Sequence, residues 1–225
     1  MKKLSEFNAF EILGPIMVGP SSSHTAGACK IANIAAKICP GPYEKVTFYL
    51  HGSFALTYKG HGTDKALLGG VLGFSTYDKR LRDSFSIAKS EGLNYEFVPT
   101  DLGEKYHPNT VKIVFSYKDK EDEYVIGTSI GGGNMVLVNI CGIAVNFKGT
   151  FPTLLFQYPE QKGIIAFVSS TLSFNNYNIE SMSTTKNELT DVVTLTVEVS
   201  NNIKKNIVTE LLNDDRFITA KYVEV

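Results

Sequence analysis

GPIMVGPSSSHTAGACKIANIAAKI, residues 14–38, sets three serines, a histidine and a threonine directly before an apolar run. In that run apolar side chains recur at steps of three and four residues, which is typical of one face of an α-helix. The repeating positions are Ala28, Ile31, Ala32, Ala35 and Ile38. Pro40-Gly41-Pro42 predicts the end of this helix. Its start falls within residues 21–25, so one of the serines there is expected to cap the first turn.

A helix cap needs one hydroxyl, but this segment supplies more polar groups than that. Ser21, Ser22, Ser23 and Thr25 offer hydroxyls, and His24 adds an imidazole. The start of a helix presents unpaired N–H groups and the positive end of the helix dipole, both of which favour an anion. The surplus of hydroxyls therefore predicts a site for a carboxylate or a phosphate.

Composition excludes several classes of partner. Lys plus Arg number 22 against 23 Asp plus Glu, so no basic field exists to hold nucleic acid or an anionic membrane. No apolar run approaches the roughly 20 residues of a membrane helix. Glu6 and Glu11 interrupt the sequence after the first lysines, where a signal segment would be continuously apolar. A cytoplasmic protein with neither nucleic-acid nor membrane partners is expected.

The cysteines do not indicate a disulfide framework or a metal site. Cys29, Cys39 and Cys141 are odd in number and lack C-x-x-C spacing, which indicates neither disulfides nor a zinc site. They are expected to be small buried hydrophobes, and no metal ligand is predicted. Because Cys29 and Cys39 lie ten residues apart in one helical pattern, a metal site at that pair stays open as the weaker alternative.

The first part of the chain alternates strands and helices. A strand is predicted over 44–51, a short helix capped by Asp64, and a further helix over 81–90. A hairpin is expected to turn at the charged residues 118–123. It runs into Gly131-Gly132-Gly133, which suits either close approach to a ligand or a sharp strand end.

From about Thr153 the pattern changes to strand, helix, two strands, helix and strand. This β-α-β-β-α-β order is the ferredoxin-like plan. A boundary is expected around Phe147–Pro152, which divides the chain into domains over 1–150 and 151–225. The fold class predicted for the whole chain is α+β, with a mixed α/β domain first.

Three of the four histidines lie in the first 61 residues, and imidazole is the side chain best suited to proton transfer near neutral pH. His24 and His61 are flanked by hydroxyl residues and glycine in predicted loops, where polar groups converge on ligands. HGS at 51–53 and HGT at 61–63 share the pattern H-G-[ST]. His51 is nevertheless expected only to end a strand and to form a local hydrogen bond. A serine hydrolase is disfavoured, because Ser21, Ser22 and Ser23 do not stand in a G-x-S-x-G elbow, and a P-loop is excluded, because G-x-x-x-x-G-K-[ST] is absent.

Three separated motifs carry a family resemblance: GPSSSHTAGA at 19–28, HGSFALTYKGHGTDKALLG at 51–69 and SIGGGN at 129–134. In this order they resemble the beta chain of iron–sulfur-dependent L-serine dehydratases (L-serine ammonia-lyases), through most of residues 5–150. The family's beta domain is itself similar to the allosteric substrate-binding domain of phosphoglycerate dehydrogenases. The resemblance implies that fold for residues 1–150.

The resemblance also implies the reaction. In the family an alpha chain holds a [4Fe-4S] cluster with one iron open to substrate, and L-serine is deaminated to pyruvate and ammonia without pyridoxal phosphate. Three cysteines cannot supply the ligands of such a cluster, so it is expected on the partner alpha chain. By the same resemblance His61 is the first candidate for proton transfer and His24 the second. The residues expected to bind substrate are Ser21, Ser22, Ser23, Thr25, Gly62 and Thr63.

Residues 151–225 resemble an ACT domain, an amino-acid-sensing module, by their element order and by NYNIESM at 176–182. The usual D-x-P-G turn is replaced by residues 159–163, which keep the glycine and lose the aspartate. Gly163, Asn178 and Ile179 occupy positions where such domains contact an effector or a second subunit. Effector binding and self-association through a ligand-free sheet are both open.

A second hypothesis comes from another class: a regulatory module that senses an anion or amino acid and takes no part in catalysis. It predicts the same fold. A sensor has little use for paired histidines, so His24 and His61 favour the enzyme subunit.

Overall fold

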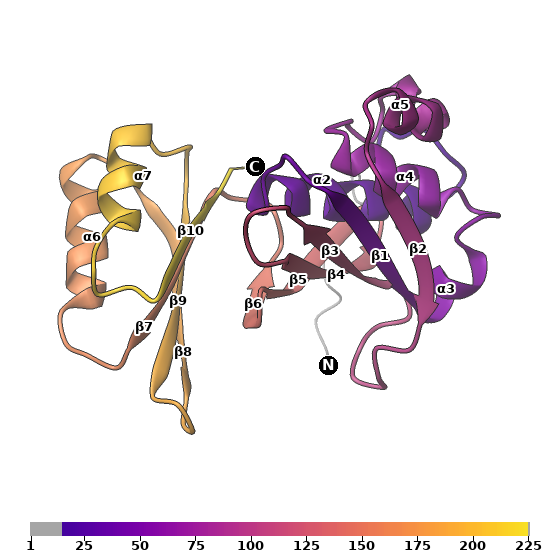
Figure 1. The fold of residues 1–225 in the computed structure, drawn as a ribbon. Helices are drawn as coiled ribbons and strands as arrows, with labels where there is room; N and C mark the ends of the chain where they lie inside the picture. Colours follow the sequence, from indigo (N-terminus) through magenta and orange to yellow (C-terminus); the bar gives the residue numbers. More distant parts are fainter. Residues whose placement is uncertain (1–14, 225) are drawn as a thin grey trace, which may run out of the picture. The chain divides into compact units, whose positions relative to one another are not determined.

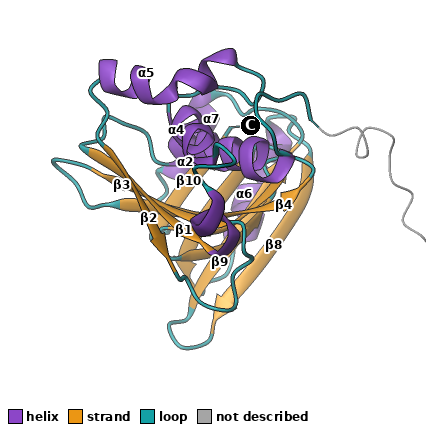
Figure 2. Ribbon diagram, turned by 90° about the vertical axis from the view of Figure 1, so that its right-hand side faces the viewer, coloured by secondary structure: helices purple, strands orange, loops and turns teal. Residues whose placement is uncertain are grey.

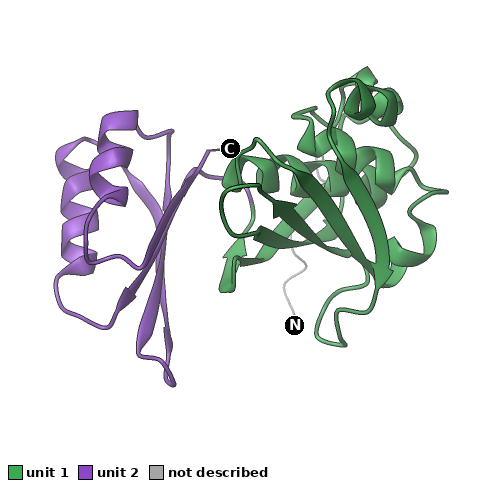
Figure 3. Cartoon of the chain, in the orientation of Figure 1, with its two compact units in different colours: residues 1–148 green, residues 149–225 purple. Residues whose placement is uncertain are grey.

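The computed structural model describes residues 15–224, and Glu6 and Glu11, which bear on the expected lack of a signal segment, lie outside the described residues. The chain divides into two compact units, one ending at Lys148 and the other beginning at Gly149 (Figure 3). Two sheets with helices confirm the predicted α+β class. Among the described residues, no helix combines the length and the apolar character needed to cross a membrane.

The described part of the first unit is built on a six-stranded sheet in the order β2-β1-β3-β4-β5-β6. Its strands are β1 (Lys45–His51), β2 (Tyr95–Thr100), β3 (Thr110–Ser116), β4 (Glu123–Gly131), β5 (Asn134–Ile140) and β6 (Ile143–Phe147). The pair β1–β2 is parallel and the other neighbours are antiparallel. The helical segments are η1 (Ser22–Gly27), α2 (Ala28–Ile38), α3 (Gly52–Thr57), α4 (Thr63–Val71), η2 (Lys79–Asp83) and α5 (Ser84–Ser90).

Helices α2 and α4 pack against each other above the sheet (Figure 1). α5 packs on α4 and lies on its far side from the sheet (Figure 2). The contact between α2 and α4 is close because Gly70 has no side chain. A Cβ there would clash with the carbonyl oxygen of Cys29 and lie 2.7 Å from the Cβ of Ala32. This contact holds the starts of the two helices, where the polar motifs lie, at fixed positions.

Most of the predicted elements of the first unit are confirmed. Ser21 caps the turn that leads into α2, its hydroxyl accepting from the backbone N–H of His24, and α2 ends at Ile38. The hairpin turning at 118–123 is β3–β4, and the helix predicted over 81–90 is a 3₁₀ turn followed by α5. Gly131-Gly132-Gly133 forms the turn from β4 to β5, with φ values of 93°, 60° and 76°. This is the strand-end alternative.

The prediction that Asp64 caps α4 is wrong. The cap is Gly62, whose φ of 68° lies in the left-handed region, and Asp64 is the second residue of the helix. The chain turns sharply between His61 and α4, and glycine adopts that conformation at little cost. The carboxylate of Asp64 instead accepts from the backbone N–H of Lys65, at 2.8 Å.

The second unit has the predicted β-α-β-β-α-β order. Its elements are β7 (Thr153–Pro159), α6 (Ile164–Phe174), β8 (Ile179–Asn187), β9 (Val192–Val199), α7 (Lys205–Leu212) and β10 (Thr219–Val223). The sheet is antiparallel in the order β10-β7-β9-β8, and α6 and α7 cover one face of it (Figure 1). Phe156, Val168, Leu195 and Leu211 are fully buried in its core. The resemblances to an ACT domain and to the phosphoglycerate dehydrogenase domain stay predictions.

Candidate active site

The segment before α2 folds as a π-helical turn, η1, that gathers hydroxyls around His24. The hydroxyl of Ser21 lies 3.3 Å from that of Ser23, and Ser23 Oγ lies 3.0 Å from Nδ1 of His24. On the other side of the ring, Nε2 lies 3.0 Å from Oγ of Ser53 in α3. Both ring nitrogens of His24 therefore have a hydroxyl partner, and this arrangement fixes the ring plane.

His61 meets this group from a different part of the sequence. Its ring centroid lies 4.9 Å from that of His24, with the ring planes inclined at 50°. Thr25 Oγ1 donates to the carbonyl oxygen of His61 at 3.5 Å, which ties the loop before α4 to η1. The structure thus brings the two predicted catalytic histidines together, with His24 half-buried and His61 exposed.

The surroundings of His24 favour its neutral form. Burial lowers the pKa of His24, and the nearby charge of His61 lowers it further. The edge-to-face contact with Phe54, at 5.3 Å between centroids, contributes to that burial. A neutral imidazole both donates and accepts a hydrogen bond, so His24 can link the hydroxyls of Ser23 and Ser53.

His51 stands apart from the histidine pair. It ends β1, as predicted, and its Nδ1 accepts from the backbone N–H of Leu102 at 3.1 Å. Asp101 lies 3.4 Å from the same nitrogen. His51 therefore joins two chain segments at the edge of the sheet.

The residues predicted to bind substrate lie around the pair. Ser21, Ser22 and Ser23 are half-buried in or beside η1, and Thr25 is buried in the same turn. Gly62 caps α4, and Thr63 is its first residue. Among the described residues the buried hydroxyl of Thr63 has no hydrogen-bond partner. All of these positions flank the two histidines or the start of α4, although no contact with a ligand tests their roles.

A cavity of about 390 Å³ adjoins this group. Thr25 and Gly62 line it, together with residues 18–20 and the cationic side chains of Lys65 and Arg82. This volume lies within the range of about 300–1,000 Å³ typical of small-molecule sites in proteins. The predicted site therefore has a hollow beside it that accommodates a small ligand.

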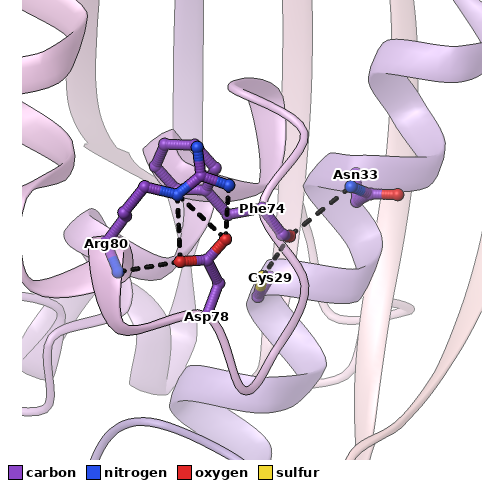
Figure 4. Close-up of polar contacts among 5 residues, drawn as sticks. All are labelled: Cys29, Asn33, Phe74, Asp78 and Arg80. Carbon is purple, nitrogen blue, oxygen red and sulfur yellow. Dashed lines mark hydrogen bonds and ion pairs between the residues drawn. The ribbon is translucent and has the colours of Figure 1, made fainter.

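The cysteines do not fit an iron–sulfur cluster. Cys29 and Cys39 are buried and Cys141 is half-buried. Burial raises the pKa of the Cys29 thiol to about 12, and its Sγ donates to the carbonyl oxygen of Phe74 (Figure 4). Within residues 15–224, no group of three or more His, Cys, Asp or Glu side chains is arranged to hold a metal ion. The expectation of small buried side chains is confirmed for Cys29 and Cys39, whereas Cys141 is only partly covered.

The predicted effector residues do not share one pocket in the described chain. Gly163 begins α6 and lines a hollow of about 340 Å³. Asn178 and Ile179 line another, of about 500 Å³, at the opposite end of the same helix. Eleven helical residues span about 16 Å, so a small effector cannot touch both groups within one chain.

Sequence comparison defines the class of protein. The family model described as serine dehydratase beta chain matches residues 7–90. The L-serine dehydratase beta chain of Peptoniphilus asaccharolyticus is 59% identical over 222 residues, covering 99% of this chain and all of that protein. A probable L-serine dehydratase beta chain of Bacillus subtilis (strain 168) is 38% identical over 204 residues, covering 91% and 92% respectively. The chain belongs to the family of L-serine dehydratase beta chains, which confirms the resemblance carried by its three motifs.

A further relative is a longer protein. The L-serine dehydratase of Helicobacter pylori (strain J99 / ATCC 700824) is 32% identical over 150 residues, which cover 56% of this chain and 32% of that protein. About two thirds of that protein therefore lies outside the region similar to this chain.

Ser53 is a member of the site that is not among the predicted site residues, although it lies within the motif at 51–69. It lies on α3, and its hydroxyl contacts His24 across 29 positions of sequence. The signal for it is the ending shared by HGS at 51–53 and HGT at 61–63, which marks both loops as similar turns.

Proposed function

We propose that the chain is the beta subunit of a two-chain L-serine dehydratase, which converts L-serine to pyruvate and ammonia. Two relatives carry the name beta chain, which implies a second kind of chain. The Helicobacter pylori protein supports the same division, because the region similar to this chain is joined there to a longer segment. The non-catalytic sensor is disfavoured by this family membership.

The [4Fe-4S] cluster belongs to the alpha chain in this proposal, because the described cysteines of this chain do not fit it. Held there, it would supply a Lewis acid for loss of the serine hydroxyl. No pyridoxal phosphate is involved. The beta chain contributes polar side chains that bind the amino acid and a group that moves its proton.

The observation that carries the proposal is the histidine pair. His61 is exposed and so available to a substrate bound between the two chains, whereas both nitrogens of His24 are engaged by hydroxyls. We assign proton abstraction from the substrate α-carbon to His61. His24, whose pKa is lowered mainly by burial, would position that ring and remain available as the second proton-transfer group.

The hydroxyls of Ser21, Ser22, Ser23, Thr25 and Thr63 would bind the carboxylate and amino groups of the substrate. Self-association through residues 149–225 and effector binding at Gly163, Asn178 or Ile179 remain part of the proposal. If an effector contacts both ends of α6, a second copy of the unit must supply one group of contacts.

The substitution His61→Ala tests the assignment in the assembled enzyme. Loss of a general base lowers turnover by roughly 10²–10⁴-fold. His107→Ala is the matched control, since His107 is an exposed histidine on another loop whose Nδ1 accepts from the N–H of Asn109. Normal turnover by the His61 variant, with the iron content unchanged, would remove His61 from the mechanism.

A further inference from the structure

The cavity beside the histidine pair has cationic side chains on two of its walls. Lys65 comes from the first turns of α4, and Arg82 from η2. Within residues 15–224, neither side chain has a carboxylate within the 4.0 Å of an ion pair. The carboxylate of Asp64 interacts with the charge of Lys65 but does not line the cavity, and two cations around one hollow favour an anion inside it.

Arg80, on the same short helix, makes a useful contrast. Its guanidinium lies 2.6 Å from Oδ2 of Asp78, and the same carboxylate accepts from its Nε (Figure 4). The charge of Arg80 is therefore compensated by its own neighbour, whereas Arg82 faces the cavity. The two arginines of η2 have different environments although they lie two residues apart.

One uncharged donor lines the same cavity, and a second lies next to a lining residue. Thr25 is only 5% exposed and lines it, and its hydroxyl makes two long contacts, 3.4 Å to the N–H of Ser21 and 3.5 Å to the carbonyl oxygen of His61. Thr63, next to the lining residue Gly62, carries the buried hydroxyl that lacks a partner among the described residues. The carboxylate of Asp64 does not line the cavity and accepts from the N–H of Lys65.

The walls of the cavity are held in place by hydrogen bonds. The carbonyl oxygen of Phe74, in the loop after α4, accepts from Cys29 Sγ at 3.4 Å and from Asn33 Nδ2 at 3.5 Å, both on α2 (Figure 4). Asp78 then caps η2 through the N–H of Arg80 at 2.9 Å. These contacts fix the segment that carries Arg82 relative to α2, so the cavity is largely preformed.

We propose that this cavity binds a small carboxylate anion through Lys65, Arg82 and the hydroxyl of Thr25. The choice of a carboxylate rests on the proposed function, whose substrate is an amino acid. The carboxylate belongs either to that substrate or to a second molecule. In the second case it would act on His61 through Thr25 and Gly62, because neither histidine ring lines the cavity.

The first test is a titration of the full beta chain followed by backbone amide NMR. L-Serine and L-lactate, which share a carboxylate, should shift the amides of Thr25, Gly62 and Lys65. Ethanolamine, which keeps the amino and hydroxyl groups of serine but lacks the carboxylate, should not. Lys65→Gln and Arg82→Gln should each weaken carboxylate binding about tenfold or more, the effect of losing one charge-assisted contact.

Two matched variants control for general changes in charge. Lys59→Gln removes an exposed lysine that does not line the cavity, and Arg80→Gln removes the compensated arginine. Both should bind L-lactate as the wild type does. Equal affinity in all four variants, or no carboxylate-dependent shift at these amides, would overturn the proposal.

Steady-state kinetics of the assembled enzyme distinguish the carboxylate of the substrate from that of a second molecule. A KM for L-serine raised about tenfold in Arg82→Gln, with kcat changed less than about twofold, would identify the substrate's own carboxylate. An unchanged KM, with turnover that responds to added L-lactate in the wild type but not in the variant, would identify a second anion. Absence of activity in the wild-type assembly would contradict the proposed function and leave the NMR result standing.

Discussion

At the scale of single residues, three neighbours determine the orientation and the pKa of the His24 ring. Ser23 and Ser53 engage its two nitrogens, and His61 places a second imidazole 4.9 Å away. The first two contacts orient the ring, and the charge of His61 lowers the pKa of His24. In the proposed function the exposed His61 meets the substrate, beside a His24 ring whose lowered pKa favours the neutral form.

The coupling predicts a shift in the titration of His24. Replacing His61 by Gln removes the charge that lowers the pKa of His24, so that pKa should rise. It should stay below the ordinary value, because burial is the larger cause and is unchanged. Titration of the His24 ring protons by NMR measures this directly. A pKa that falls or does not move in His61→Gln would mean that the two rings are not coupled.

The lowered pKa of His24 also predicts how stability depends on pH. The unfolded chain, with a histidine pKa of about 6.5, binds a proton that the folded chain still excludes. The contribution of His24 to the free energy of unfolding is therefore complete above about pH 6.5 and is lost as the pH falls through its folded pKa. Urea unfolding across that window should show a weaker decline in His24→Gln than in the wild type. Parallel curves for the two proteins would contradict this assignment.

Only part of the site can be predicted from residue types alone. Histidines among hydroxyls and glycines indicate His24 and His61, because such loops are unusual unless they bind something. Ser53 and the cationic wall formed by Lys65 and Arg82 depend on how α2, α3, α4 and η2 meet in space. Hydrophobic periodicity within one element does not predict how that element packs against the others.

At the scale of elements, the close contact of α2 and α4 positions both polar motifs. Gly70→Ala would push α4 away from Cys29 and Ala32, which should lower the free energy of unfolding by about 1–3 kcal/mol. Gly60→Ala is the matched control, because its Cβ would meet only the carbonyl oxygen of Thr57, at 3.8 Å. Urea denaturation of both variants measures the difference. Equal stability of the two would show that α2 and α4 can separate without cost.

The elements predicted from sequence are those with a strong local pattern. α2 has an apolar stripe bounded by a cap and by prolines. In the second unit, side chains of β9 alternate between buried and half-buried positions. β2, β5 and β6 lie outside the elements predicted. β2 contains Pro99, which weakens the signal for a strand, and its only partner among the described strands is β1, about 50 residues away. The sequence pattern favours Asp64 over Gly62 as the cap of α4, because a left-handed glycine leaves no side-chain signature.

At the scale of the whole molecule, the two units have separate cores. Leu195 is fully buried in the core of the second unit, and its replacement by Ala should destabilise that unit by about 2–5 kcal/mol. Amide hydrogen exchange should then accelerate in β7 and β9 while protection in α2 and α4 is kept. Leu67→Ala, at a fully buried position of the first unit, should give the reverse pattern. Acceleration in both units from either change would mean that they unfold as one.

The division of labour between chains is the central claim, and anaerobic pyruvate release from L-serine tests it most directly. The beta chain alone, the alpha chain alone and the two together would be assayed, with iron measured in each sample. Activity that requires both chains, with iron carried by the alpha chain, is the predicted result. Iron and activity in the beta chain by itself, or an intact and iron-loaded pair that leaves L-serine unchanged, would contradict the account.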